Sequence, residues 1–310
     1  MQRSLSAAVL LFAWATVAAQ TFPSKPVRIV VPFPPGGGAD TLARIMEPRL
    51  AAIWGQPVIV ENRSGASGHI GADFVAKSAP DGATLLMSST ASLTEKNVGQ
   101  FAPVSLVSAS PYVVTASPKV AASNIRELIA LAKSKPGKLS FASSGTGAAS
   151  HLSAELFRSM AGVDLLHVPY KGTGQAVTDL LAGHVDLMFA PAQTVMPYVR
   201  EGRLKALALT GSKRSETLAD LPTVAESGVP GYAAVGWFGL LAPAATPRPV
   251  VAKISADANR VLAEREVREK MVGLGADPSG DTPEEFARFI REDQAKWGKL
   301  MKEAGIAAPQ

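Results

Sequence analysis

The chain has 310 residues, of which 47% are hydrophobic and 18% are charged. This balance is typical of a folded protein and excludes an intrinsically disordered one, and the length allows roughly two domains. The sequence has no cysteine, which excludes disulfide bonds, thiolate metal sites and a cysteine nucleophile. The net charge of +5 comes without any lysine- or arginine-rich run, so it does not indicate nucleic-acid binding.

Residues 1–19 have the pattern of a secretory signal peptide. Arg3 is the only charged residue among them, and the apolar run of residues 5–18 is too short to span a bilayer comfortably. Small residues precede Gln20, so we expect cleavage after Ala19 and export, with a membrane anchor as the alternative. Export makes cytosolic cofactor chemistry and DNA binding unexpected, and we expect no cofactor.

Predicted strands and predicted helices alternate along the rest of the chain, with short loops between them. This alternation predicts an α/β fold in which a parallel or mixed sheet is covered by helices on both faces. The predicted strands cover residues 27–31, 57–60, 84–87, 102–116, 139–142, 165–168, 185–189, 204–209 and 235–241. The predicted helices cover residues 41–52, 72–77, 124–135, 148–161, 175–182, 249–262 and 266–274, and a last one begins after Thr282.

Polar residues mark three of the helix starts. Asp40 is expected to be the N-cap of the first helix, and Asn124 with Glu127 and Thr282 with Glu285 have the spacing of a capping box. In the last helix, apolar side chains recur at helical spacing and predict a face that packs on the core. These residues are Phe286, Phe289, Ile290, Trp297, Leu300 and Met301.

Two predicted strands are long enough to run from one domain into another. They are residues 102–116, which we expect to be broken at Pro111, and residues 235–241. The pattern predicts two α/β lobes joined by these crossing strands as a hinge, and small ligands often bind in the cleft between such lobes. Lobe 1 is expected to cover residues 20–110 and 232–310, and lobe 2 residues 111–231.

Three loops share one design, in which a strand ends, small residues follow and a helix begins. They are residues 32–40, 88–91 and 143–147. The first turn of a helix offers unpaired N–H groups and a partial positive charge, so these loops suit a carboxylate, phosphate or sulfate. The alternative is that they only connect strands to helices. None of them has the sequence of a P-loop or of a dinucleotide-binding loop.

An exported hydrolase acting on a carboxylate ester or amide is the competing hypothesis. It would need an activated nucleophile, but no G-x-S-x-G motif occurs and the four histidines lack metal-ligand spacing. His151 could contact a ligand or brace the preceding loop, and bracing is the stronger interpretation. Lys171 follows a predicted strand and could face an anion or the solvent. We therefore expect a binding protein that is not an enzyme and holds no metal.

The chain resembles the Bug or TctC-type solute-binding proteins of tripartite tricarboxylate transporters over essentially its whole mature length. No single motif is specific, but their combination is. The matching segments are Lys25–Arg28, Pro34–Asp40, Val60–Arg63, Ala79–Gly82, His167–Gly172, Val185–Phe189 and Leu221–Gly228.

The resemblance implies a two-lobed periplasmic binding protein of the type II class, expected to be a monomer. Such a receptor captures a small carboxylate, such as a dicarboxylate, an amino acid or an aromatic acid, and delivers it to integral-membrane permease subunits. A role as the receptor of a membrane sensor is an open alternative. The ligand-binding residues that the loops and the resemblance together indicate are Gly36, Gly37, Gly38, Asp40, Ser89, Thr90, Ser144, Gly145, Thr146, His151, Tyr170, Lys171 and Gly172.

Two departures from the family pattern concern the walls of the pocket. The segment Ala91–Gln100 is shorter than is usual in the family, so we expect one wall of the pocket to differ. The segment Phe189–Ala192 lacks a polar residue that relatives often carry, which predicts a less polar pocket on that side.

Overall fold

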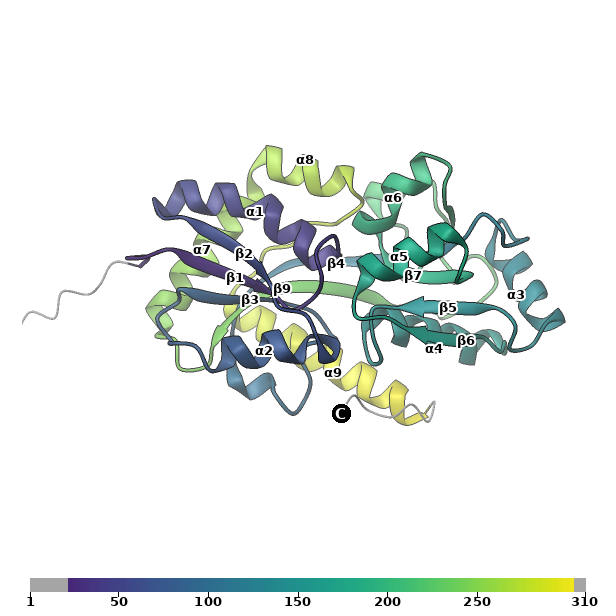
Figure 1. Ribbon diagram of the computed structural model, residues 1–310, viewed down its shortest axis with the longest axis horizontal. Helices are drawn as coiled ribbons and strands as arrows, with labels where there is room; N and C mark the ends of the chain where they lie inside the picture. The colour runs from purple at the N-terminus through teal and green to yellow at the C-terminus, as the bar shows by residue number, and fades with distance from the viewer. Residues whose placement is uncertain (1–21, 304–310) are drawn as a thin grey trace, which may run out of the picture.

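The computed structural model describes residues 22–303, so the predicted signal peptide lies outside the described residues. The chain forms two α/β halves joined by long strands (Figure 1). The strands are β1 (Val27–Val31), β2 (Val58–Asn62), β3 (Thr84–Ser88), β4 (Phe101–Ala116), β5 (Ser140–Ser143), β6 (Leu166–Pro169), β7 (Leu187–Pro191), β8 (Lys205–Leu209) and β9 (Val235–Pro243). The helices are α1 (Gly38–Trp54), α2 (His69–Ala76), α3 (Ile125–Ser134), α4 (Ala149–Ala161), α5 (Thr173–Ala182), α6 (Ala192–Arg200), α7 (Arg248–Ala263), α8 (Arg265–Gly273) and α9 (Pro283–Glu303).

The strands form one mixed sheet in the order β2-β1-β3-β9-β4-β7-β5-β6, with β8 also paired to β4. We call the half with β1, β2, β3 and β9 lobe 1, and the half with β5, β6, β7 and β8 lobe 2. In Figure 1, α1 and α8 lie above the sheet of lobe 1 and α2 below it, while α5 and α6 lie above lobe 2 and α4 below it. The predicted mixed sheet with helices on both faces is therefore confirmed.

Strand β4 belongs to both lobes. Its first part, through Pro111, pairs antiparallel with β9, and its last part, from Tyr112, pairs with β7 and β8. The expected break at Pro111 is wrong, because the strand is continuous. Proline has no N–H to donate, and Pro111 lies where β4 leaves one partner strand and meets the next, so it interrupts no continuous ladder.

Helix α1 starts earlier than the sequence predicts. Gly37 is its N-cap, so the expected N-cap role of Asp40 is wrong. Asp40 lies in the first turn, where its carboxylate accepts a hydrogen bond from the Gly36 N–H at 2.9 Å. The two glycines bend the loop directly into the helix, because Gly36 adopts a left-handed φ of 81° that other residues avoid.

The other two predicted helix starts are confirmed. The Asn124 side chain accepts a hydrogen bond from the Glu127 N–H, and the Thr282 hydroxyl accepts one from the Glu285 N–H. Helix α6, which has Pro197 inside it, was not predicted.

Helix α9 packs against both lobes. Phe286 and Ile290 belong to a core cluster with Trp237 of β9, whereas Trp297 belongs to the main core cluster of lobe 2, with Leu300 and Met301 packed against it. The predicted core face is thus confirmed, but it serves two cores. Our division at residues 110/111 and 231/232 stays a proposal, with α9 as a segment shared by both lobes. Within residues 22–303, no helix is both long and apolar enough to cross a membrane.

Candidate functional site

A small cavity lies where four helices begin, between the two lobes. α1, α4, α5 and α6 each contribute a residue from their first turn or their N-cap. The loops before them leave the carboxyl ends of β1, β5, β6 and β7, which is where ligands bind in open α/β sheets. The cavity measures about 20 Å³. Its lining residues are Phe33, Gly37, Gly38, Ala39, Ser89, Tyr112, Ser144, Ala148, Ala149, Thr173, Pro191 and Phe238.

The cavity is rich in hydrogen-bond donors. In α1 the first intrahelical bond runs from the Thr41 N–H to the Gly37 carbonyl, so the amides of Gly38 and Ala39 have no acceptor within the helix. Among the described residues, the hydroxyls of Ser89 and Thr173 have no hydrogen-bond partner. Free N–H groups at helix N-termini together with free hydroxyls favour an anion.

Asp40 supports the first loop rather than facing the cavity. Its carboxylate accepts hydrogen bonds from the Gly36 N–H, from Arg44 Nε at 3.0 Å and from Asn62 Nδ2 at 3.0 Å. Burial by itself would raise the pKa of Asp40, but the bonds from Arg44, Gly36 and Asn62 outweigh burial and lower this pKa below its usual value. Asp40 is therefore ionised, its oxygens already accept hydrogen bonds from within the protein, and it fixes the position of Gly36.

His151 braces the loop before α4. Its Nδ1 accepts a hydrogen bond from the Gly147 N–H at 3.1 Å, and its ring stacks on His167 with the centroids 4.1 Å apart. The Nε2 atom of His167 lies 2.7 Å from the Ser143 hydroxyl. Burial lowers the pKa of both rings to about 4, helped for His151 by the Arg158 charge and for His167 by His151. Two neutral imidazoles therefore hold the loop of residues 143–147.

Glycines of lobe 2 touch lobe 1 directly. A Cβ on Gly172 would lie 2.6 Å from Cδ of Pro34, and one on Gly145 would lie 2.9 Å from the Ser67 hydroxyl. Such approaches are possible only without a side chain. The structure therefore has the two lobes in contact around the small cavity.

Four other predicted residues do not line the cavity. The Tyr170 hydroxyl donates a hydrogen bond to Asp179 at 2.6 Å, and burial followed by this carboxylate raises the pKa of Tyr170 to about 12. Thr146 and Lys171 are exposed. Gly36 lines a separate surface depression with Gly174 and Thr194.

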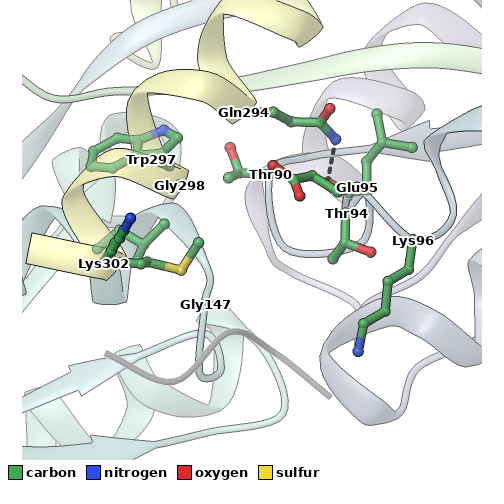
Figure 2. Close-up of a pocket in the computed structure, with 12 residues that line it drawn as sticks. Thr90, Thr94, Glu95, Lys96, Gly147, Gln294, Trp297, Gly298 and Lys302 are labelled. Atoms are coloured by element: carbon green, nitrogen blue, oxygen red, sulfur yellow. Dashed lines mark hydrogen bonds between the residues drawn. The ribbon is translucent and has the colours of Figure 1, made fainter. Parts of the chain in front are cut away.

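A larger pocket of about 410 Å³ lies beside the cavity, between the loop after β3, the start of α4 and the C-terminal half of α9 (Figure 2). Thr90 and Gly147 line it, so the Ser89–Thr90 loop contributes to both hollows. The segment Ala91–Gln100 supplies one wall through Leu93, Thr94, Glu95 and Lys96.

The predicted loops thus meet, but only part of the predicted residues line the cavity, namely Gly37, Gly38, Ser89 and Ser144. Tyr112 and Phe238 were missed because they lie within the two crossing strands, where the sequence signals only a core. Thr173 was missed although it directly follows the predicted Gly172. The described residues include no group of three or more His, Cys, Asp or Glu side chains that could hold a metal ion.

Residues 42–306 match the family model described as the tripartite tricarboxylate transporter family receptor. The chain belongs to this family. Among curated relatives, Protein BugT of Bordetella pertussis is 38% identical over 302 residues, covering 94% of this chain and 93% of BugT.

Two solved structures of similar proteins contain a bound acid. The structure of Rpa4515 from R. palustris with adipate is 34% identical and superposes with a TM-score of 0.88, covering 92% of this chain and 99% of that one. MatC from Rhodopseudomonas palustris with bound malate is also 34% identical, with a TM-score of 0.83 and coverages of 90% and 99%. The family resemblance expected from the sequence is confirmed, and the chain is a solute receptor of the tripartite tricarboxylate transporter type.

Proposed function

We propose that this receptor binds a small organic carboxylate in the cavity between α1, α4, α5 and α6. The observation that carries the proposal is the convergence of four helix N-termini on one cavity with free hydroxyls. The acids bound by Rpa4515 and MatC, adipate and malate, support the same ligand class. We further propose that the receptor works in the periplasm after removal of residues 1–19 and delivers its ligand to membrane permease subunits.

The number of available donors is sufficient for useful affinity. A hydrogen bond to a charged group contributes about 1.5–3 kcal/mol, and a micromolar ligand requires about 8 kcal/mol in total. Hydrogen bonds to the ligand would together reach that total, even though part of their free energy offsets the entropy cost of ordering the ligand. Their donors are the amides of Gly38, Ala39 and Ala149 and the hydroxyls of Ser89 and Thr173. Because these donors come from both lobes, a bound carboxylate favours the closed state over an open one.

The test is a thermal-shift screen of the purified protein followed by calorimetry. The panel contains malate, adipate, amino acids, aromatic acids, phosphate and sulfate. We expect a carboxylate to raise the melting temperature, because a ligand at 100 times its Kd stabilises the folded state by about 2.7 kcal/mol. The acid should be recovered chemically unchanged. Binding of no carboxylate would contradict the proposal, and conversion of the bound acid would favour the hydrolase alternative.

Removing one hydroxyl from the cavity tests the site directly, and removing one elsewhere gives a matched control. Ser89→Ala removes a donor that has no other partner, so we expect Kd for the carboxylate to rise about tenfold, as for the loss of one charged hydrogen bond. Ser134→Ala is the control, because its exposed hydroxyl bonds only to the Leu131 carbonyl on α3. Equal affinity of the two variants would place the carboxylate elsewhere.

A further inference from the structure

We propose that the 410 Å³ pocket beside the cavity receives the apolar tail of the acid whose carboxylate lies in the cavity. The preferred ligands are then carboxylic acids with an aromatic or long alkyl tail. We call this hollow the tail pocket, lined by Thr90, Leu93–Lys96, Gly147, Leu152, Gln294, Trp297, Gly298, Met301 and Lys302. The inference rests on the proposed function, because it extends the ligand bound there.

The cavity between the helix N-termini is too small for a whole ligand. Its volume of about 20 Å³ is close to the space of a single water molecule. Phe33, Tyr112 and Phe238 are all buried around it, so it cannot widen without moving large aromatic side chains. With the lobes in contact, it has room for little more than a carboxylate group, and the rest of the acid must lie in another space.

The tail pocket is that space because it shares two loops with the cavity. Ser89 lines the cavity and Thr90 lines the tail pocket, and in the same way Ala148 lines the cavity and Gly147 the tail pocket. Each loop therefore presents neighbouring residues to both hollows. On this proposal the acid extends past these two loops into the tail pocket, whose volume lies within the usual range of about 300–1,000 Å³ for small-molecule sites.

The chemistry of the tail pocket favours an apolar tail. Leu93 of the loop after β3, Leu152 of α4, and Trp297 and Met301 of α9 line it. The indole N–H of Trp297 donates to Asp293 at 2.8 Å, so Trp297, which packs in the core of lobe 2, presents no free polar atom to the pocket. Buried apolar surface of this kind stabilises a hydrocarbon tail by about 25 cal/mol per Å² removed from water.

Charged side chains at this pocket do not select a charged tail. Glu95, Lys96 and Lys302 are exposed, and among the described residues none of them forms an ion pair. Glu95 reaches toward α9, since its Oε1 would lie 3.6 Å from a Cβ on Gly298. The two ammonium groups outnumber the carboxylate, but all three side chains are exposed, so water and salt screen their attraction for a second carboxylate on the tail.

The experiment measures the affinity for butyrate, hexanoate and 4-phenylbutyrate by calorimetry, with competition for weak ligands. We expect Kd to fall about threefold to fourfold per added methylene group and to be lowest for 4-phenylbutyrate. Equal Kd values along the series would overturn the tail pocket while leaving the carboxylate site in place. Binding of no acid at all would instead contradict the proposed function itself.

A variant that fills the tail pocket distinguishes a tail bound there from a general preference of the protein for hydrophobic acids. Gly298→Phe adds a ring inside the tail pocket at a helical position where a Cβ has ordinary contact distances. We expect this variant to keep its affinity for butyrate and to lose at least tenfold for 4-phenylbutyrate. The control is Gly273→Phe, at the end of α8, where a Cβ meets nothing within 4 Å. An unchanged preference for the longer acids in Gly298→Phe would overturn the proposal.

Discussion

His151 stacks on His167 with the ring centroids 4.1 Å apart and the planes 23° from parallel. His167 in turn stacks on Phe141 of β5 at 4.8 Å. One imidazole accepts the Gly147 N–H and the other contacts the Ser143 hydroxyl, so the pair fixes both ends of the loop before α4. This loop supplies Ser144 to the cavity and Gly147 to the tail pocket.

The first prediction concerns pH. Both rings have a folded-state pKa of about 4 against an ordinary value of 6.5, mainly because of burial. Between these values the unfolded chain binds more protons than the folded one, so the free energy of unfolding decreases as the pH falls from 7 to 5. His151 is 4% exposed, and its share of the loss at pH 5 is about 2 kcal/mol.

Urea denaturation at pH 7 and pH 5 measures this loss. His151→Gln should be less stable at pH 7 and lose less stability at pH 5 than the unchanged protein. His184→Gln is the control, because the His184 side chain is 70% exposed, and it should behave as the unchanged protein does. An equal loss in His151→Gln would show that other groups carry the pH dependence.

The second prediction compares neighbouring glycines of the first loop. A Cβ on Gly38 would lie 2.7 Å from Gln193 Nε2 and 2.7 Å from Phe238 Cζ, whereas one on Gly37 would have nothing closer than 3.8 Å. Overpacking costs about 1–3 kcal/mol, so Gly38→Ala should weaken carboxylate binding by about tenfold or more. Gly37→Ala should change Kd by less than about threefold. Calorimetry on both variants tests this, and the reverse order would contradict the closed geometry.

The third prediction concerns the contact between the lobes. Gly172→Ala places a methyl group against Pro34, 2.6 Å from its Cδ. The φ of 163° at Gly172 is extended backbone that alanine also adopts, so the effect comes from the contact and not from backbone strain. We expect weaker ligand binding, an increased radius of gyration in small-angle X-ray scattering and an unchanged melting temperature.

Gly99→Ala is the control for Gly172→Ala, because a Cβ at Gly99 meets nothing within 4 Å. It should match the unchanged protein in ligand affinity and in scattering. If Gly172→Ala leaves both the affinity and the radius of gyration unchanged, Pro34 shifts to accommodate the methyl group and the lobes stay in contact.

The fourth prediction concerns Asp293 of α9, which links this helix to the crossing strand β9 through Trp237. Its carboxylate accepts hydrogen bonds from the indole N–H groups of Trp237 and Trp297, each at 2.8 Å and each on a different oxygen. Asparagine has one acceptor oxygen and would present an NH₂ group to one indole N–H. We expect Asp293→Asn to lower the free energy of unfolding by about 1–3 kcal/mol.

Urea denaturation of Asp293→Asn and of Glu292→Gln measures this cost. Glu292 is the next residue on α9 and its side chain is exposed, so its substitution should change stability by less than about 0.5 kcal/mol. Similar stabilities of the two variants would show that the indole pair contributes little.

Much of the fold could be predicted because local patterns already determine it. The capping boxes at Asn124 and Thr282 and the apolar face of the last helix depend on neighbours a few residues away, and all were confirmed. The continuous β4 and helix α6 were not predicted. Pro111 acts as a break in isolation, and only its place between two successive partner strands makes it tolerable in β4.

Local sequence patterns already establish that strands end in small residues and that helices begin there, because glycine, serine and capping preferences act over one turn of chain. Which of these ends meet depends on how the two lobes pack together. Ser89 and Thr90 are neighbours with the same loop chemistry, yet one lines the cavity and the other the tail pocket. Asp40 and His151 are of residue types that often bind ligands, but here they bind other parts of the protein. Asp40 accepts hydrogen bonds from Arg44 and Asn62, and His151 accepts one from the Gly147 N–H. Such assignments depend on side chains distant in sequence, which no local pattern specifies.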